Sequence, residues 1–143
     1  MMSIELKSKT TLYPLLFAIS GAHLINDSLQ TVIPASYPIL RDSLDLTYTQ
    51  LGLITFILYL TSSIMQPVVG AYADRRPSPF ILPIGMALSL MGMLGLAFSP
   101  GYVAVLCSVV FVGLASAIFH PEGSRIAYLA AGSRRGLAQA IYQ

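Results

Sequence analysis

Four polar residues share one face of an apolar stretch near the start of the chain. His23, Asp27 and Gln30 follow the helical spacing i, i+4 and i+7, and Asn26 lies one position aside, so all four fall within about 100° of one face. A carboxyl group beside an imidazole can load and release a proton or bind a polar substrate. The spacing therefore predicts a proton or substrate site. The alternative is a structural network in which His23 hydrogen-bonds Asp27 within its own helix.

A second group of ionisable residues, His120, Glu122 and Arg125, lies much further along the chain. If a helix continues through Pro121 to about residue 131, Glu122 and Arg125 can pair at i, i+3. If the helix ends at Pro121, both side chains lie at its end and are solvated. Helical spacing places His120 nearly opposite Glu122, so a single site for all three requires a bend at Pro121.

Composition restricts the kind of fold that can hold these groups. Of the 143 residues, 55% are hydrophobic and 10% are charged, and there is one cysteine. Soluble domains carry about 25% charged residues, disordered chains have low hydrophobicity, and disulfide scaffolds are rich in cysteine. The net charge of +2 comes without a basic run, so no nucleic-acid partner is predicted. The expected surroundings are a lipid bilayer.

Long intervals without formal charge predict membrane spans, because crossing a bilayer core takes about 20 apolar helical residues. Only Asp27 interrupts the interval between Lys9 and Arg41, and none interrupts the one between Arg76 and Glu122. We expect an all-α membrane protein with four transmembrane helices and the start of a fifth, after an N-terminal tail at 1–10. The predicted helices are 11–40, 47–73, 79–98 and 102–131, with a fifth starting at 137.

The basic residues predict how these helices are oriented. Cytoplasmic loops of membrane proteins carry an excess of Lys and Arg. On the predicted topology, Arg41 lies on one side, next to two aspartates, and six basic residues lie on the other. The N-terminus is therefore expected in the cytoplasm, on the side of Lys7, Lys9, Arg75, Arg76, Arg134 and Arg135.

The turn at 70–76, Gly-Ala-Tyr-Ala-Asp-Arg-Arg, carries the most specific local pattern. Gly70, Asp74 and Arg75 resemble the signature loop between the second and third helices of major facilitator superfamily transporters, although the second half of that motif is lost. An aspartate at a helix C-terminus is disfavoured by the helix dipole, so Asp74 implies a partner. The resemblance implies that this partner lies in the other half of the transporter. The alternative is an ordinary positive-inside loop with one solvated aspartate.

Further motifs are spread along the chain: His-Leu-Ile-Asn-Asp at 23–27, Gln-Pro-Val-Val-Gly at 66–70, Leu-Pro-Ile-Gly-Met at 82–86, Phe-His-Pro-Glu at 119–122 and Gly-Leu-Ala-Gln at 136–139. Together they resemble the fosmidomycin resistance protein branch of that superfamily. The resemblance implies a twelve-helix, proton-driven exporter in the bacterial inner membrane, with its first and fourth helices lining the cavity and a small-molecule substrate. Fosmidomycin is a phosphonate, so Arg125 would suit an anionic compound of that kind.

The length of the chain leaves other functions open. Such transporters bind substrate where two repeats meet, so 143 residues predict an N-terminal fragment of less than half a transporter, completed by the missing remainder. The alternatives are a small four-helix multidrug exporter acting as a dimer and a non-transporting membrane assembly protein. No His-Glu-x-x-His pair or serine nucleophile elbow is present, so the sequence predicts no enzyme, metal or cofactor.

Overall fold

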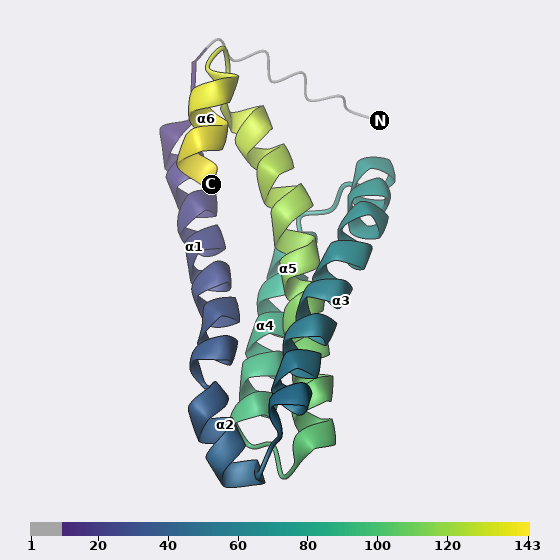
Figure 1. Ribbon diagram of the computed structural model, residues 1–143. Coiled ribbons are helices and arrows are strands. Elements are labelled where there is room, and N and C mark those ends of the chain that lie inside the picture. The colour runs from purple at the N-terminus through teal and green to yellow at the C-terminus, as the bar shows by residue number, and fades with distance from the viewer. Residues whose placement is uncertain (1–9) are drawn as a thin grey trace.

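The computed structural model describes residues 10–143, which form a helical bundle with no strand in that part of the chain (Figure 1). This confirms the predicted all-α class. Of the predicted tail at 1–10, residues 1–9, with Lys7 and Lys9, lie outside the described residues. The helices are α1 (Tyr13–Ala35), α2 (Tyr37–Leu44), α3 (Tyr48–Arg75), α4 (Ile81–Ala97), α5 (Tyr102–Ala130) and α6 (Arg135–Tyr142).

The first predicted helix, 11–40, is divided into α1 and α2 at Ser36. Pro38 has no N–H to donate to the carbonyl of Pro34, and a proline ring clashes with the carbonyl four residues earlier. The backbone of Ser36 turns at this point, with its N–H donating to the carbonyls of Val32 and Ile33. The expectation of one continuous helix is therefore wrong. A short α2 instead carries Arg41 at the end of the bundle.

The other helix ends follow local chemistry. Thr47 and Gln50 form a capping box at the start of α3, in which each side chain accepts a hydrogen bond from the other residue's backbone N–H. Helix α5 continues through Pro121 and ends before Gly132, whose φ of 58° is the left-handed conformation that glycine adopts most readily. The alternative in which this helix ends at Pro121 is therefore wrong.

Helix α5 is the shared centre of the bundle, since α1, α3, α4 and α6 all contact it. Two glycines allow this close packing. A Cβ atom on Gly92 of α4 would lie 2.5 Å from Cγ2 of Val112 on α5, and one on Gly113 would lie 2.9 Å from the carbonyl oxygen of Leu58 on α3. Lipid gives helices little hydrophobic reason to associate, so membrane bundles depend on such small-residue contacts.

Two apolar clusters lie toward opposite ends of the bundle. Side chains from α1, α2, α3, α4 and α5 form the first cluster, which includes Ile33, Ile54 and Val109. Leu16 and Tyr142 belong to the second, which joins α1, α5 and α6. The polar residues of α1 fall between the two clusters along the helix. The bundle therefore has a polar layer near mid-length, with apolar packing on both sides.

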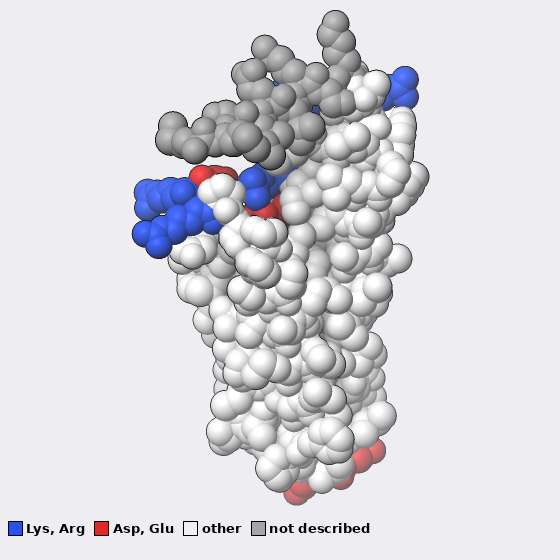
Figure 2. Space-filling model, turned by 180° about the vertical axis from the view of Figure 1, so that it is seen from behind, with Lys and Arg blue, Asp and Glu red and all other residues white. Residues whose placement is uncertain are grey.

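The outer surface suits a lipid environment. Large apolar side chains are exposed on several helices, including Leu24 (67%), Phe56 (57%) and Leu90 (59%). Figure 2 shows charged side chains near the two ends of the bundle and an uncharged surface between them. Arginines lie at the end of α3 and around the start of α6, whereas the opposite end has α2 with one arginine and two aspartates at 41–45.

Within residues 10–143, two helices are long and apolar enough to cross a membrane, namely α3 and α5. Their 28 and 29 residues correspond to about 42 and 44 Å at 1.5 Å per residue, more than the roughly 30 Å of a bilayer core. Helix α4 is apolar but has 17 residues, and α1 has 23 residues with a polar face. The predicted count of four spans therefore stays a prediction.

We predict that Gly92→Ala destabilises the protein by about 1–3 kcal/mol, because the new methyl group overpacks the α4–α5 contact. Gly52→Ala on α3 is the matched control, since a Cβ atom there meets nothing within 4 Å. Thermal unfolding in detergent, followed by circular dichroism, measures both variants. Equal melting temperatures for Gly92→Ala and the parent protein would contradict the close packing.

Candidate functional site

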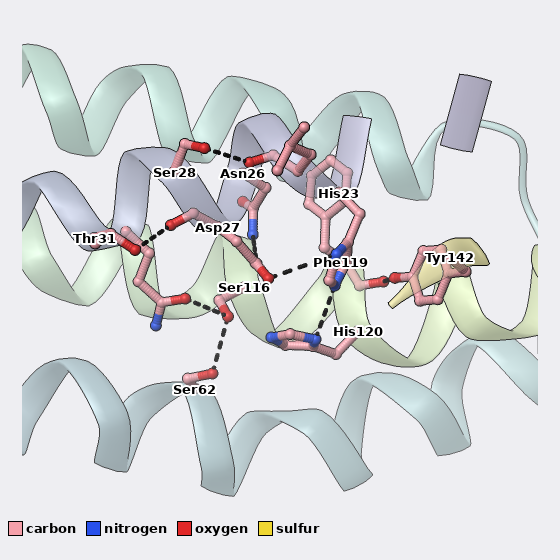
Figure 3. A network of polar contacts seen from close by, with 12 residues as sticks. His23, Asn26, Asp27, Ser28, Thr31, Ser62, Ser116, Phe119, His120 and Tyr142 are labelled. Atoms are coloured by element: carbon pink, nitrogen blue, oxygen red, sulfur yellow. Dashed lines mark hydrogen bonds and ion pairs between the residues drawn. The ribbon is translucent and has the colours of Figure 1, made fainter. Parts of the chain in front are cut away.

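Three ionisable side chains from α1 and α5 meet in the polar layer (Figure 3). His23 Nε2 lies 3.2 Å from His120 Nδ1, a hydrogen bond whose donor depends on the tautomers. On the other side of the same ring, His23 Nδ1 lies 3.5 Å from Asp27 Oδ2. The side chain of His23 is 8% exposed and that of Asp27 is 41% exposed. His23 therefore connects a carboxyl group on its own helix with an imidazole on α5.

Asn26 joins this group to α4. Its Oδ1 accepts a hydrogen bond of 2.9 Å from the hydroxyl of Ser89, and both residues are buried. Its Nδ2 donates to Asp27 Oδ1 at 3.4 Å. Because a buried amide is costly unless it is hydrogen-bonded, these contacts fix the rotation of α1 against α4 and orient the Asp27 carboxylate.

Gln30 extends the polar layer to α3. The hydroxyl of Ser116 on α5 donates to Gln30 Oε1 at 3.3 Å and accepts from Ser62 on α3 at 3.2 Å. Gln66 Nε2 in turn donates to the Ser62 hydroxyl at 3.4 Å. Hydrogen bonds therefore link α1, α5 and α3 across the middle of the bundle. Of the four expected residues of α1, Asp27 contacts its neighbours on the same helix. The other three, His23, Asn26 and Gln30, hydrogen-bond to other helices.

Helix α6 closes one side of the site. The hydroxyl of Tyr142 donates to the carbonyl oxygen of Phe119 at 2.9 Å, and its ring centroid lies 4.5 Å from that of His23. The tyrosine packs over Gly123, where a Cβ atom would collide with its ring. These contacts position the His23 ring.

A cavity of about 640 Å³ opens onto this group. His23, Asp27 and His120 line it together with polar side chains of α3, α5 and α6. A cavity of this size can hold water or a small molecule. The remaining lining residues are Gln66, Pro121, Ser124, Tyr142 and Gln143.

Glu122 and Arg125 form a separate site on α5. Arg125 Nε donates to Glu122 Oε2 at 2.9 Å, and its Nη2 donates to Oε1, so the pair is bidentate. The Glu122 side chain is 3% exposed and that of Arg125 is 30% exposed. The pair faces the α3–α4 turn, in a pocket also lined by 77–79, and not the cavity of His120. His120 and Glu122 therefore do not share a site.

Most of the signature motif at 70–76 lies inside the last turns of α3 and not in the turn between α3 and α4. Asp74 and Arg75 are exposed in its last turn, and Gly70 faces Pro121, since a Cβ atom on this glycine would lie 3.6 Å from the proline Cβ. Asp74 also lies close enough to interact electrostatically with Arg125.

Four residues of the site were not predicted from the sequence. Ser62 and Ser116 are polar residues within intervals that lack charge, and this pattern was the available signal. Ser89 carries the same signal, whereas Tyr142 carries none; the roles of both depend on how α4 and α6 pack on α1 and α5.

Comparison with known proteins identifies the family. Residues 19–143 match the Major Facilitator Superfamily. The chain is 61% identical to the transporter YfnC of Bacillus subtilis and 47% identical to the fosmidomycin resistance protein of Escherichia coli, each over 96% of this chain and 34% of the relative. It is 32% identical to the phosphoglycerate transporter protein of Salmonella typhimurium over 55% of this chain and 17% of that protein. No solved structure matches.

A helical bundle with an uncharged apolar surface and a polar interior layer is an integral membrane protein. The family match over most of its length shows that the chain belongs to the major facilitator superfamily of transporters. The expected similarity to the fosmidomycin resistance protein is confirmed, and so is the expectation that the chain is not an enzyme. The chain spans about a third of the length of the first two relatives.

We predict that Arg125→Met destabilises the protein by about 3 kcal/mol, because it leaves the buried Glu122 carboxylate unpaired. Glu122→Gln should cost less, since the partly exposed Arg125 can turn toward the surface. The double variant should be more stable than the sum of the two single effects implies. Thermal unfolding of the four proteins in detergent measures this coupling, and strictly additive losses would contradict a paired structure.

Proposed function

We propose that this chain forms the N-terminal part of a proton-coupled exporter of small molecules, resembling fosmidomycin resistance proteins. The observation that carries the proposal is the contact between His23, Asp27 and His120 beside a cavity in the middle of the bundle. Ionisable groups at membrane depth are costly and mark ion or proton pathways. The 47% identity to the fosmidomycin resistance protein of Escherichia coli supports export of a drug and a role in antibiotic resistance.

The arrangement of these groups supports the proposal of proton coupling. Asp27 is partly exposed to the cavity, so a proton can reach its carboxyl group. His23 lies between Asp27 and His120, so a proton gained by one group changes the electrostatic energy of the other two. Proton binding can thereby be linked to a change in the contact between α1 and α5. Antiport would use that linkage to drive substrate out.

The proposed location is the bacterial inner membrane, with four spans formed by α1, α3, α4 and α5 and a fifth begun by α6. We place the N-terminus in the cytoplasm, together with the end of the bundle that carries the arginines of α3 and α6. The substrate-binding surface would be completed by the remainder of the transporter, as the relatives of about three times this length suggest.

The alternative of a dimeric four-helix exporter is less well supported, because the family match extends over residues 19–143 and includes α6. A membrane assembly protein without transport would have no use for a cavity lined by three ionisable groups. Transport assays with the complete protein distinguish these functions.

We predict that Asp27→Asn abolishes the pH dependence of transport. A step that requires one proton changes by at most about tenfold per pH unit, and the variant should vary far less than the parent protein. Asp45→Asn at the end of α2 is the matched control, since asparagine also tolerates the left-handed conformation found there. The measurement is substrate flux in proteoliposomes that contain the complete protein, over a range of pH. An unchanged pH profile in Asp27→Asn would remove the proton role.

Arg125 has two possible roles that one experiment separates. In the structure its charge is matched by Glu122, so we infer that it stabilises the region around the α3–α4 turn. Arg125→Ala is then expected to reduce export of anionic and neutral substrates by the same factor. If Arg125 binds an anionic substrate such as a phosphonate, export of the anionic compound should fall about tenfold more than export of the neutral one. Glu122→Gln serves as the control for loss of the pair alone.

A further inference from the structure

The contact between His23 and His120 has a geometry that suits a bound cation. Their facing nitrogens are 3.2 Å apart, and one ligand atom from each of His23, Asp27 and His120 lies within 4.8 Å of the other two. Zinc–nitrogen bonds of 2.0–2.1 Å in a tetrahedral site place neighbouring ligand atoms about 3.3 Å apart. The two imidazoles therefore already lie at the separation that a shared metal ion requires.

The ligand types point to a divalent transition metal. Two imidazoles and one carboxylate suit zinc, and a fourth position would be left for water. The carboxylate of Asp27 has to move to bind the same ion, because it lies nearest to Nδ1 of His23, the ring nitrogen that does not face His120. Its side chain is 41% exposed to the cavity, which leaves room for this movement.

The surroundings also favour a cation. None of the described residues that line the cavity is a lysine or arginine, whereas Asp27 contributes a carboxylate. Arg125, a strong cation further along α5, is paired with Glu122 and lines a different pocket. Tyr142 holds the His23 ring from one side, so the ring keeps its orientation toward His120.

We propose that His23, Asp27 and His120 bind one divalent transition-metal ion, with Zn²⁺ as the best match to their donor atoms. The sequence could not predict this site, because the two histidines are 97 residues apart and lie on different helices. The proposal does not depend on proton-coupled transport, since metal binding is measured directly on the purified protein.

The test uses the complete protein that carries this chain, purified in detergent without a histidine tag. Isothermal titration with Zn²⁺ is expected to show one bound ion per chain. His120→Gln and His23→Gln should each weaken binding at least tenfold, because each removes one of three ligands, whereas Asp42→Asn on α2 should leave it unchanged. Size-exclusion chromatography shows whether each variant remains folded.

A second measurement does not depend on variants. Co²⁺ added to the parent protein should give the intense visible absorption of a tetrahedral site, and Zn²⁺ should displace it. Absence of Zn²⁺ binding, an octahedral Co²⁺ spectrum, or equal binding by the folded His120→Gln variant would each overturn the proposal. A metal site could be confirmed while Asp27→Asn keeps its pH profile, so this proposal and the proposed transport function can fail separately.

Discussion

The cost of placing polar groups in a lipid-surrounded bundle governs this structure. An unpaired polar side chain in such an interior loses several kcal/mol of hydration without compensation. Among residues 10–143, no buried side-chain nitrogen or oxygen lacks a hydrogen-bond partner. Many of these partners are on α5, which supplies Ser116, the carbonyl group of Phe119, His120 and Glu122. The helices around α5 are therefore held in register by polar contacts that lipid cannot replace.

Such contacts need the helices to approach closely, and this explains where the small residues lie. Gly92 and Gly113 bring α4 and α3 against α5 on the side of the first apolar cluster, and Gly123 makes room for the ring of Tyr142 on α6. Hydrogen bonds such as those of Ser116 extend only 3.2–3.3 Å, so even a small shift of α3 or α1 would break them. Packing by glycine and pairing of polar groups thus depend on each other.

Local spacing was sufficient to predict features that lie within one helix. It placed His23 and Asp27 on one face of α1, and the possible pairing of Glu122 with Arg125 is observed on a helix that continues past Pro121. Contacts between helices were not predictable, because lipid-exposed and buried faces are both apolar and no periodicity distinguishes them. The meeting of His23 with His120 and the pairing of Asn26 with Ser89 belong to this second kind.

The two clusters of ionisable side chains differ in their surroundings, and this difference suits them to different roles. Glu122 and Arg125 neutralise each other through two hydrogen bonds, and the buried carboxylate cannot lose its partner cheaply. The group of His23, Asp27 and His120 has no lysine or arginine beside it among residues 10–143 and reaches a cavity through Asp27. A buried ion pair of this kind is suited to maintaining the geometry of α5. Under the proposed function, the other group, with His120 on α5 and its two remaining members on α1, would alter the contact between these two helices when its charge changes.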